Sequence, residues 1–118
     1  MITIIAENSG NTLHPVTSQL VNAAISIGSS AHIICPGGIG AIEATKLTGV
    51  NKVTSVLGDC FEIFDGSAWA EAINSSIDDD FDLIFTSATS QGREIGAIIA
   101  AKRKVPIIQD AISLDSTI

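Results

Sequence analysis

Residues 82–108 read DLIFTSATSQGREIGAIIAAKRKVPII, a stretch that contains a complete strand–helix–strand unit. Its first part, DLIFTS (82–87), is an apolar run that predicts a buried strand, and PII (106–108) predicts a short closing strand. Between them the apolar side chains recur at helical spacing, which predicts one packed helix face made of Ile95, Ile98, Ile99 and the stem of Lys102. Two strands joined through a helix run parallel, because the helix carries the chain back over the sheet in a right-handed crossover.

The same alternation covers the rest of the chain. Earlier apolar runs predict strands at 2–6, 31–35 and 52–57. Helical spacing predicts one helix from Val16 to a stop at Gly28, one over 39–48 ended by Gly49, and one capped by Ser67 that reaches Ile77. The sequence therefore predicts a single α/β domain over residues 1–118. We expect a doubly wound, three-layer parallel sheet of about five strands in the order 3-2-1-4-5, of the Rossmann-like or adenine-nucleotide-binding kind.

Composition narrows the possible functions. The 118 residues are 46% apolar and carry a formal net charge of -7. Without a basic patch to collect phosphates, we expect no nucleic-acid partner. No run approaches the roughly 18 apolar residues of a membrane span, and the N-terminus lacks the basic region of a signal peptide, so we expect no membrane insertion and a cytoplasmic location. Cys35 and Cys60 lie far apart, outside any CxxC motif, and are expected to be free thiols.

Parallel sheets bind ligands beyond the carboxyl ends of their strands, where the strand order reverses. Here that edge is formed by the loops at 6–11 and 86–93. The second loop is the better candidate for an anion or nucleotide site, because hydroxyl donors, a glycine and a cation gather near a helix N-terminus: Thr86, Ser87, Thr89, Ser90, Gly92 and Arg93. In the simpler interpretation, Ser90 only caps the helix and Glu94 favours its positive end. Both interpretations remain open from the residues alone.

Other motifs favour structural roles. CPGGIGA (35–41) is not GxGxxG and follows the second strand, so its glycines predict a tight turn. His14 and His32 stand alone, and the DDD run at 78–80 predicts a solvated turn, so we expect no metal site. No acid is paired with a base at catalytic spacing, which argues against an enzyme. A small enzyme using Glu7 and Ser87 is the remaining catalytic hypothesis.

Four segments carry a resemblance to a known family: ITIIAEN (2–8), the helix TSQLVNAAISIG (17–28), GVNKVTSVLGD (49–59) and FTSATSQGREIGAIIAAKRKVPIIQDAISL (85–114). They are similar to the N-terminal domain of the electron transfer flavoprotein alpha subunit. The shared features are Ala6–Glu7 after the first strand, Gly49 to Val53, Ala88 to Glu94, Ala100–Ala101 and Gln109–Asp110. The departures are mild: Glu94 replaces a usual Asp, Gly96 stands near a common Pro, and Gln109 replaces a frequent Ser.

The resemblance implies a scaffold rather than an enzyme. Family members pass electrons from flavin dehydrogenases to a membrane quinone reductase through one FAD. The alpha domain pairs with a similarly folded beta subunit as a heterodimer, and a separate flavin domain, in cis or in trans, holds the FAD. We therefore expect no FAD bound by residues 1–118 alone. Because the equivalent fold of the beta subunit binds AMP, a stand-alone adenine-nucleotide-binding module with its phosphate at 86–93 is the alternative. In either case the acidic balance predicts an apolar or neutral docking surface.

Overall fold

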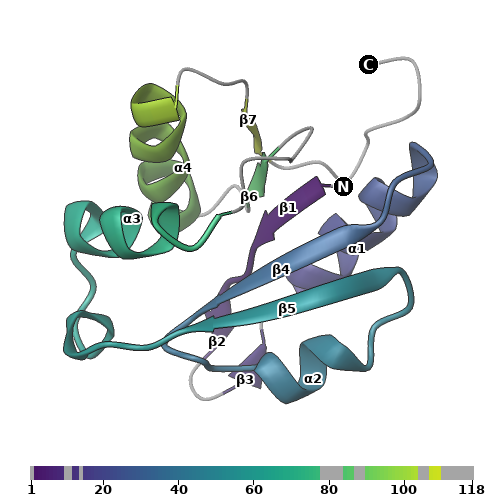
Figure 1. The fold of residues 1–118 in the computed structure, drawn as a ribbon, viewed down its shortest axis with the longest axis horizontal. Helices are drawn as coiled ribbons and strands as arrows, with labels where there is room; N and C mark the ends of the chain where they lie inside the picture. The colour runs from purple at the N-terminus through teal and green to yellow at the C-terminus, as the bar shows by residue number, and fades with distance from the viewer. Residues whose placement is uncertain are drawn as a thin grey trace.

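The sheet runs through the middle of the molecule. The computed structural model describes residues 2–9, 12–13, 15–77, 84–86, 90–103 and 107–109. Its parallel strands are β1 (Ile2–Ile5), β4 (Ala31–Pro36), β5 (Val50–Val56), β6 (Ile84–Thr86) and β7 (Ile107–Gln109). They pair in the order β5-β4-β1-β6-β7 (Figure 1). The predicted parallel order 3-2-1-4 is confirmed, and β7 pairs in parallel with β6.

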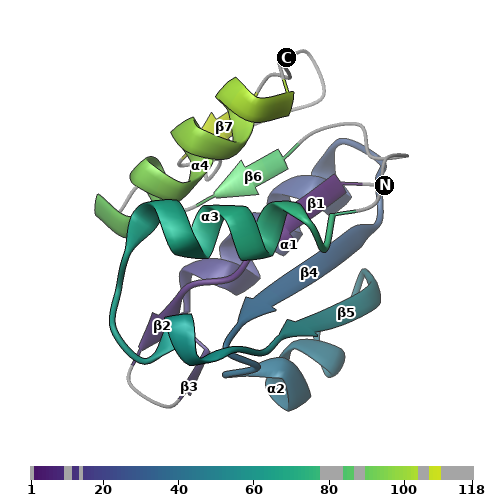
Figure 2. The same ribbon diagram turned by 60° about the vertical axis from the view of Figure 1, so that its left-hand side comes forward.

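Helices cover both faces of this sheet, as expected for a doubly wound fold. α1 (Val16–Ser26) and α2 (Ala41–Thr45) lie on one face, and α3 (Gly66–Asn74) and α4 (Ser90–Arg103) lie side by side on the other (Figure 2). Each face has its own apolar core. Within β4, Ile33 and Cys35 belong to the core under α1, whereas Ile34 belongs to the core under α3 and α4. This period of two follows from the pleat, and burial on both faces explains why the strands read as continuous apolar runs.

The first loop contains structure that the sequence did not predict. A small antiparallel pair lies in this loop and just after it, β2 (Asn8–Ser9) and β3 (Thr12–Leu13). Strands of two residues are too short to show an alternating pattern, which is why sequence periodicity missed them.

The second helix is shorter than predicted. It ends at Thr45 rather than near residue 48, and Gly49 lies beyond it, in the turn that leads into β5. Gly49 has a φ of 94°, in the left-handed region that favours glycine, and a Cβ there would lie 2.5 Å from Cδ1 of Ile25. The glycine therefore serves a tight turn against α1 and not a helix end.

Two further predictions about side chains are wrong in detail. Asp65, not Ser67, caps α3, because its carboxylate accepts hydrogen bonds from the backbone N–H groups of Ser67 and Ala68 at 3.1 and 3.2 Å. On α4, Lys102 is exposed, and Arg103 instead forms hydrogen bonds with residues at and just beyond the end of α3. The Arg103 guanidinium donates to the side chain and carbonyl of Asn74 and to the carbonyl of Ile77, three acceptors near the end of α3. His14 and the DDD run (78–80) lie outside the described residues.

Candidate functional site

The predicted ligand corner lies where β1 and β6 end and α4 begins. Thr86 is the last residue of β6 and is fully buried. Gly92 is buried in the first turn of α4, and Arg93, next to it, is exposed. Ser90 is the first residue of α4, but its side chain lies outside the described part of the structure, as do Ser87 and Thr89. The structure thus places Thr86, Gly92 and Arg93 near one helix N-terminus, and the other three donors stay predictions.

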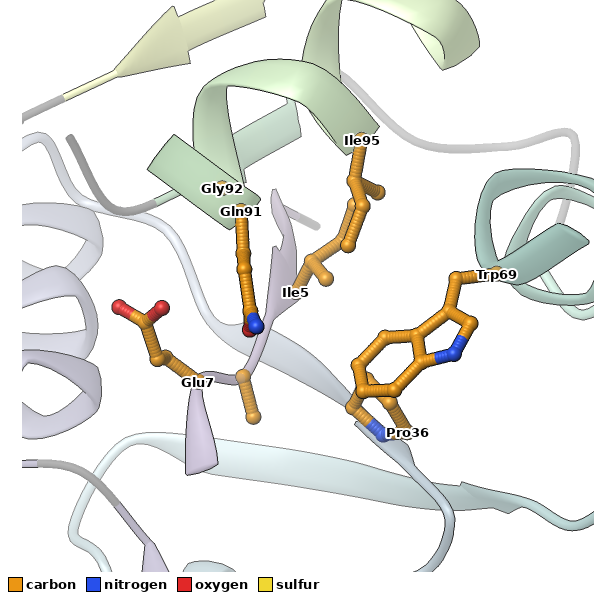
Figure 3. A pocket seen from close by; sticks show the side chains of 8 residues that line it. Ile5, Glu7, Pro36, Trp69, Gln91, Gly92 and Ile95 are labelled. Carbon is orange, nitrogen blue, oxygen red and sulfur yellow. The ribbon is translucent and has the colours of Figure 1, made fainter. Parts of the chain in front are cut away.

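A small cavity opens at this corner (Figure 3). Its walls come from the end of β1, the end of β4, α3 and the first turns of α4, and they are formed by Ile5, Ala6, Glu7, Pro36, Trp69, Gln91, Gly92 and Ile95. Among the predicted anion-site residues whose side chains the structure describes, Gly92 lines it and Thr86 and Arg93 do not, while Glu7, the candidate of the catalytic hypothesis, also lines it. The Gln91 side chain extends from α4 toward the strand ends, and the Trp69 indole stands beside Pro36 (Figure 3).

Half of these lining residues lie in the two loops that the sequence indicated, 6–11 and 86–93, and the other half do not: Ile5, Pro36, Trp69 and Ile95. Pro36 could have been found, because it ends the strand next to β1 at the same edge of the sheet. Trp69 gave no such signal, since only the packing of α3 brings it to this corner.

The size of the cavity decides what it can hold. Its volume is about 20 Å³. About 10–15 Å³ is enough for one water, whereas pockets for small-molecule ligands and cofactors measure roughly 300–1,000 Å³. The described residues of the corner therefore do not fit an adenosine or an isoalloxazine ring in this conformation, and the chemistry of a flavin is not assigned to them.

One buried polar group at the corner has no hydrogen-bond partner among the described residues. The Thr86 hydroxyl is buried and forms no hydrogen bond within the described structure. Leaving a buried donor unsatisfied costs about 1–3 kcal/mol, so such groups are uncommon in folded proteins. Thr86 does not line the cavity itself, but a polar ligand at this edge of the sheet would explain why its hydroxyl has no partner among the described residues.

The remaining sequence candidates have structural roles. The residues from Gly37 to Gly40 form the predicted tight turn after β4. His32 is buried in β4, and its Nε2 shares a hydrogen bond of 2.7 Å with Oγ1 of Thr54 in β5. Cys35 and Cys60 are free thiols, and burial raises the pKa of the Cys35 thiol to about 11, which makes it unreactive near neutral pH.

The described ranges contain neither a metal-binding cluster nor a membrane-spanning helix. No group of three or more His, Cys, Asp or Glu residues there could hold a metal ion. None of the helices in those ranges combines the length and apolar character needed to cross a bilayer.

The family follows from comparison with known proteins. The electron transfer flavoprotein domain model matches residues 2–117, which is nearly the whole chain and includes every element of the sheet described above. The chain belongs to the electron transfer flavoprotein domain family. A comparison with curated proteins gave no match.

Membership of the electron transfer flavoprotein family indicates the general role of the domain. A domain of this family is a component of an electron carrier rather than a conventional enzyme. Such a component needs a redox cofactor in its assembly and surfaces that join it to other proteins. The described part of this electron transfer flavoprotein domain contains a sheet with a core on each face and a corner too small for the cofactor. Surfaces that contact other proteins are therefore the remaining functional feature of the described residues.

Proposed function

We propose that this chain is the docking domain of an electron transfer flavoprotein alpha subunit. It pairs with the beta subunit as a heterodimer and supports a flavin domain, joined in cis or in trans. That domain holds the FAD which accepts electrons from flavin dehydrogenases. The observation that carries the proposal is the family match over residues 2–117. The alpha assignment is supported by the sequence features between Ala88 and Asp110.

The chemistry of the described residues supports a scaffold role. Electron transfer in a flavoprotein takes place at the flavin, and the described corner is too small to hold one in this conformation. What the domain contributes is a fixed arrangement of surface loops around a core that is buried on both faces of the sheet. A rigid fold lowers the entropy cost of bringing the other parts of the assembly together.

The test is isolation of the native protein from its own cells. The proposal expects a second, similarly folded subunit to copurify with the chain and the preparation to show the visible absorption of a flavin. Titration of the purified chain with the purified beta subunit, followed by calorimetry, then measures the pairing directly. A colourless preparation whose chain has no affinity for the beta subunit contradicts the proposal.

The buried hydroxyl of Thr86 favours one second candidate, a stand-alone adenine-nucleotide-binding module. In this alternative, AMP places its phosphate at the α4 N-terminus near Gly92 and Arg93, and the corner widens to admit it. Calorimetry with AMP, ADP and ATP at millimolar concentration tests the alternative, and Arg93→Ala should weaken binding if the loop holds a phosphate. Absence of heat with all three nucleotides removes it.

A further inference from the structure

Two of the most exposed large apolar side chains among the described residues lie in the segment after β5. This segment, the 57–65 loop, runs from Leu57 to Asp65 and contains the 3₁₀ turn η1 (Asp59–Phe61). Leu57 is 75% exposed and Ile63 is 82% exposed. Two adjoining surface hollows of about 480 and 370 Å³ contain these side chains, one each, and share Asp59 and Glu62. The two aliphatic side chains therefore belong to one continuous hollowed surface.

This loop is held firmly from beneath. The indole Nε1 of Trp69 in α3 donates hydrogen bonds to the carbonyls of Cys60 at 2.7 Å and Ile63 at 3.2 Å. The rings of Phe61 and Phe64 pack edge-on against the same indole, with centroids 5.1 and 5.0 Å away. Each edge-on aromatic pair contributes about 0.5–1.5 kcal/mol beyond its buried area. The loop thus presents its outer face in a fixed conformation, which reduces the ordering cost of a binding event.

Exposure of the Leu57 and Ile63 side chains to water is energetically unfavourable. Burying a Leu or Ile side chain stabilises a protein by about 1.5–3 kcal/mol relative to leaving it exposed. Single exposed apolar residues are common on protein surfaces, whereas apolar side chains gathered on one surface favour a site for another protein.

The charge around the surface identifies the kind of partner. Asp59, Glu62 and Asp65 are exposed on the loop. No Lys, Arg or His occurs in the sequence between Lys52 and Arg93, so the loop and the helix behind it carry charge of one sign. A second copy of the same surface would place like charges opposite one another, which costs several kcal/mol across an interface.

We propose that the 57–65 loop is a docking surface for a different protein, whose contacting face is aliphatic or aromatic at its centre and rich in Lys or Arg at its rim. Ile63 and Leu57 fill apolar depressions on that partner, and the acidic rim attracts it and fixes its orientation. This inference rests on the proposed function, so the partner to test is the electron transfer flavoprotein beta subunit.

The experiment compares variants of the chain in calorimetric titrations with the beta subunit. Ile63→Asp and Ile63→Ser should each raise the dissociation constant by about tenfold or more, as expected for a central contact residue. The matched control is Ile42→Asp on α2, which changes another side chain that is 75% exposed but lies outside the loop. It should change the dissociation constant by less than about twofold. Thermal melts of all variants check that the fold is intact.

The charged rim has its own measurement. The double variant Asp59→Asn, Glu62→Gln should slow association by stopped-flow and reduce its dependence on salt, while changing dissociation little. Association that is unchanged by this variant contradicts the acidic rim as part of the site.

The outcomes separate this inference from the proposed function. If the parent binds the beta subunit and Ile63→Asp binds equally well, the docking role stands and the 57–65 loop is not its surface. If the parent has no affinity for the beta subunit, the proposed function fails and this inference fails with it. If sedimentation shows that the parent forms dimers which Ile63→Asp abolishes, the occupant is a second copy and the heterologous partner is wrong.

Discussion

Thr86 shows how a single residue divides the two functional hypotheses. It is one of four buried polar residues in the described chain, and its hydroxyl has no hydrogen-bond partner there. Thr17 is equally buried, but its hydroxyl accepts the backbone N–H of Glu7 at 3.4 Å. The two threonines therefore form a matched pair that differs in hydrogen bonding and not in burial.

We expect Thr86→Val to raise the free energy of unfolding by about 1 kcal/mol, because it removes an unsatisfied donor at nearly constant volume. Thr17→Val should lower the free energy of unfolding by a similar amount, since Glu7 N–H then loses its acceptor. Urea denaturation of both variants measures these changes. A loss of stability in Thr86→Val would mean that the hydroxyl has a partner in solution, which is a water, a ligand or a residue outside the described ranges, and the calorimetry with AMP then tests the ligand.

Among the elements, α3 is the one whose capping residue the structure corrects. Ser67 has the right chemistry for a cap, but Asp65 precedes the helix with an extended backbone and accepts two N–H groups. The correct cap also matters for the 57–65 loop, because it fixes the point where the loop joins the helix that carries Trp69.

Removal of that cap gives a prediction at this scale. Asp65→Ala should lower the free energy of unfolding by about 0.5–2 kcal/mol, because the first turn of α3 loses its acceptor. Ser67→Ala is the control and should change stability by less than about 0.5 kcal/mol, since its side chain is exposed within the helix. Equal losses in the two variants would contradict the cap seen in the structure. Thermal unfolding followed by circular dichroism makes the comparison.

At the scale of the whole molecule, stability comes from two cores that share one sheet. Ile84 and Ile99 are fully buried in the core under α3 and α4, as the helical and strand patterns led us to expect for this region. Ile98, predicted as a core residue, is only partly buried at the margin of that core. Ile98 therefore contributes less buried area to this core than its neighbour Ile99.

The neighbours Ile98 and Ile99 therefore give a test on one helix. Ile99→Ala should lower the free energy of unfolding by about 2–5 kcal/mol, and Ile84→Ala should do the same, because each leaves a cavity in a close-packed core. Ile98→Ala should cost less than either, since solvent already reaches that side chain. Chemical denaturation measures all three. If Ile98→Ala costs as much as Ile99→Ala, the observed packing of α4 on the sheet is wrong.

The sequence alone determined the architecture of this protein. Apolar runs and helical spacing are local patterns, and together they predict parallel strands joined by helices. The order 3-2-1-4 was expected because it is common among doubly wound folds, and the structure has it. The same local reading identified the edge of the sheet where Thr86, Gly92 and Arg93 gather. The short features failed, such as β2 and β3 with two residues each, because a period cannot be read from so few positions.

Only the tertiary structure decided what the surfaces can do. The sequence pattern could not predict that Trp69 lines the ligand corner, whose volume is about 20 Å³. It also could not predict that the indole N–H of Trp69 forms hydrogen bonds with the 57–65 loop. Nor could it choose Arg103 over Lys102 as the residue that joins α4 to α3. The physical reason is common to these cases. Cavity size, loop support and the exposure of Ile63 depend on contacts between segments far apart in the sequence, and such contacts form only when the layers pack.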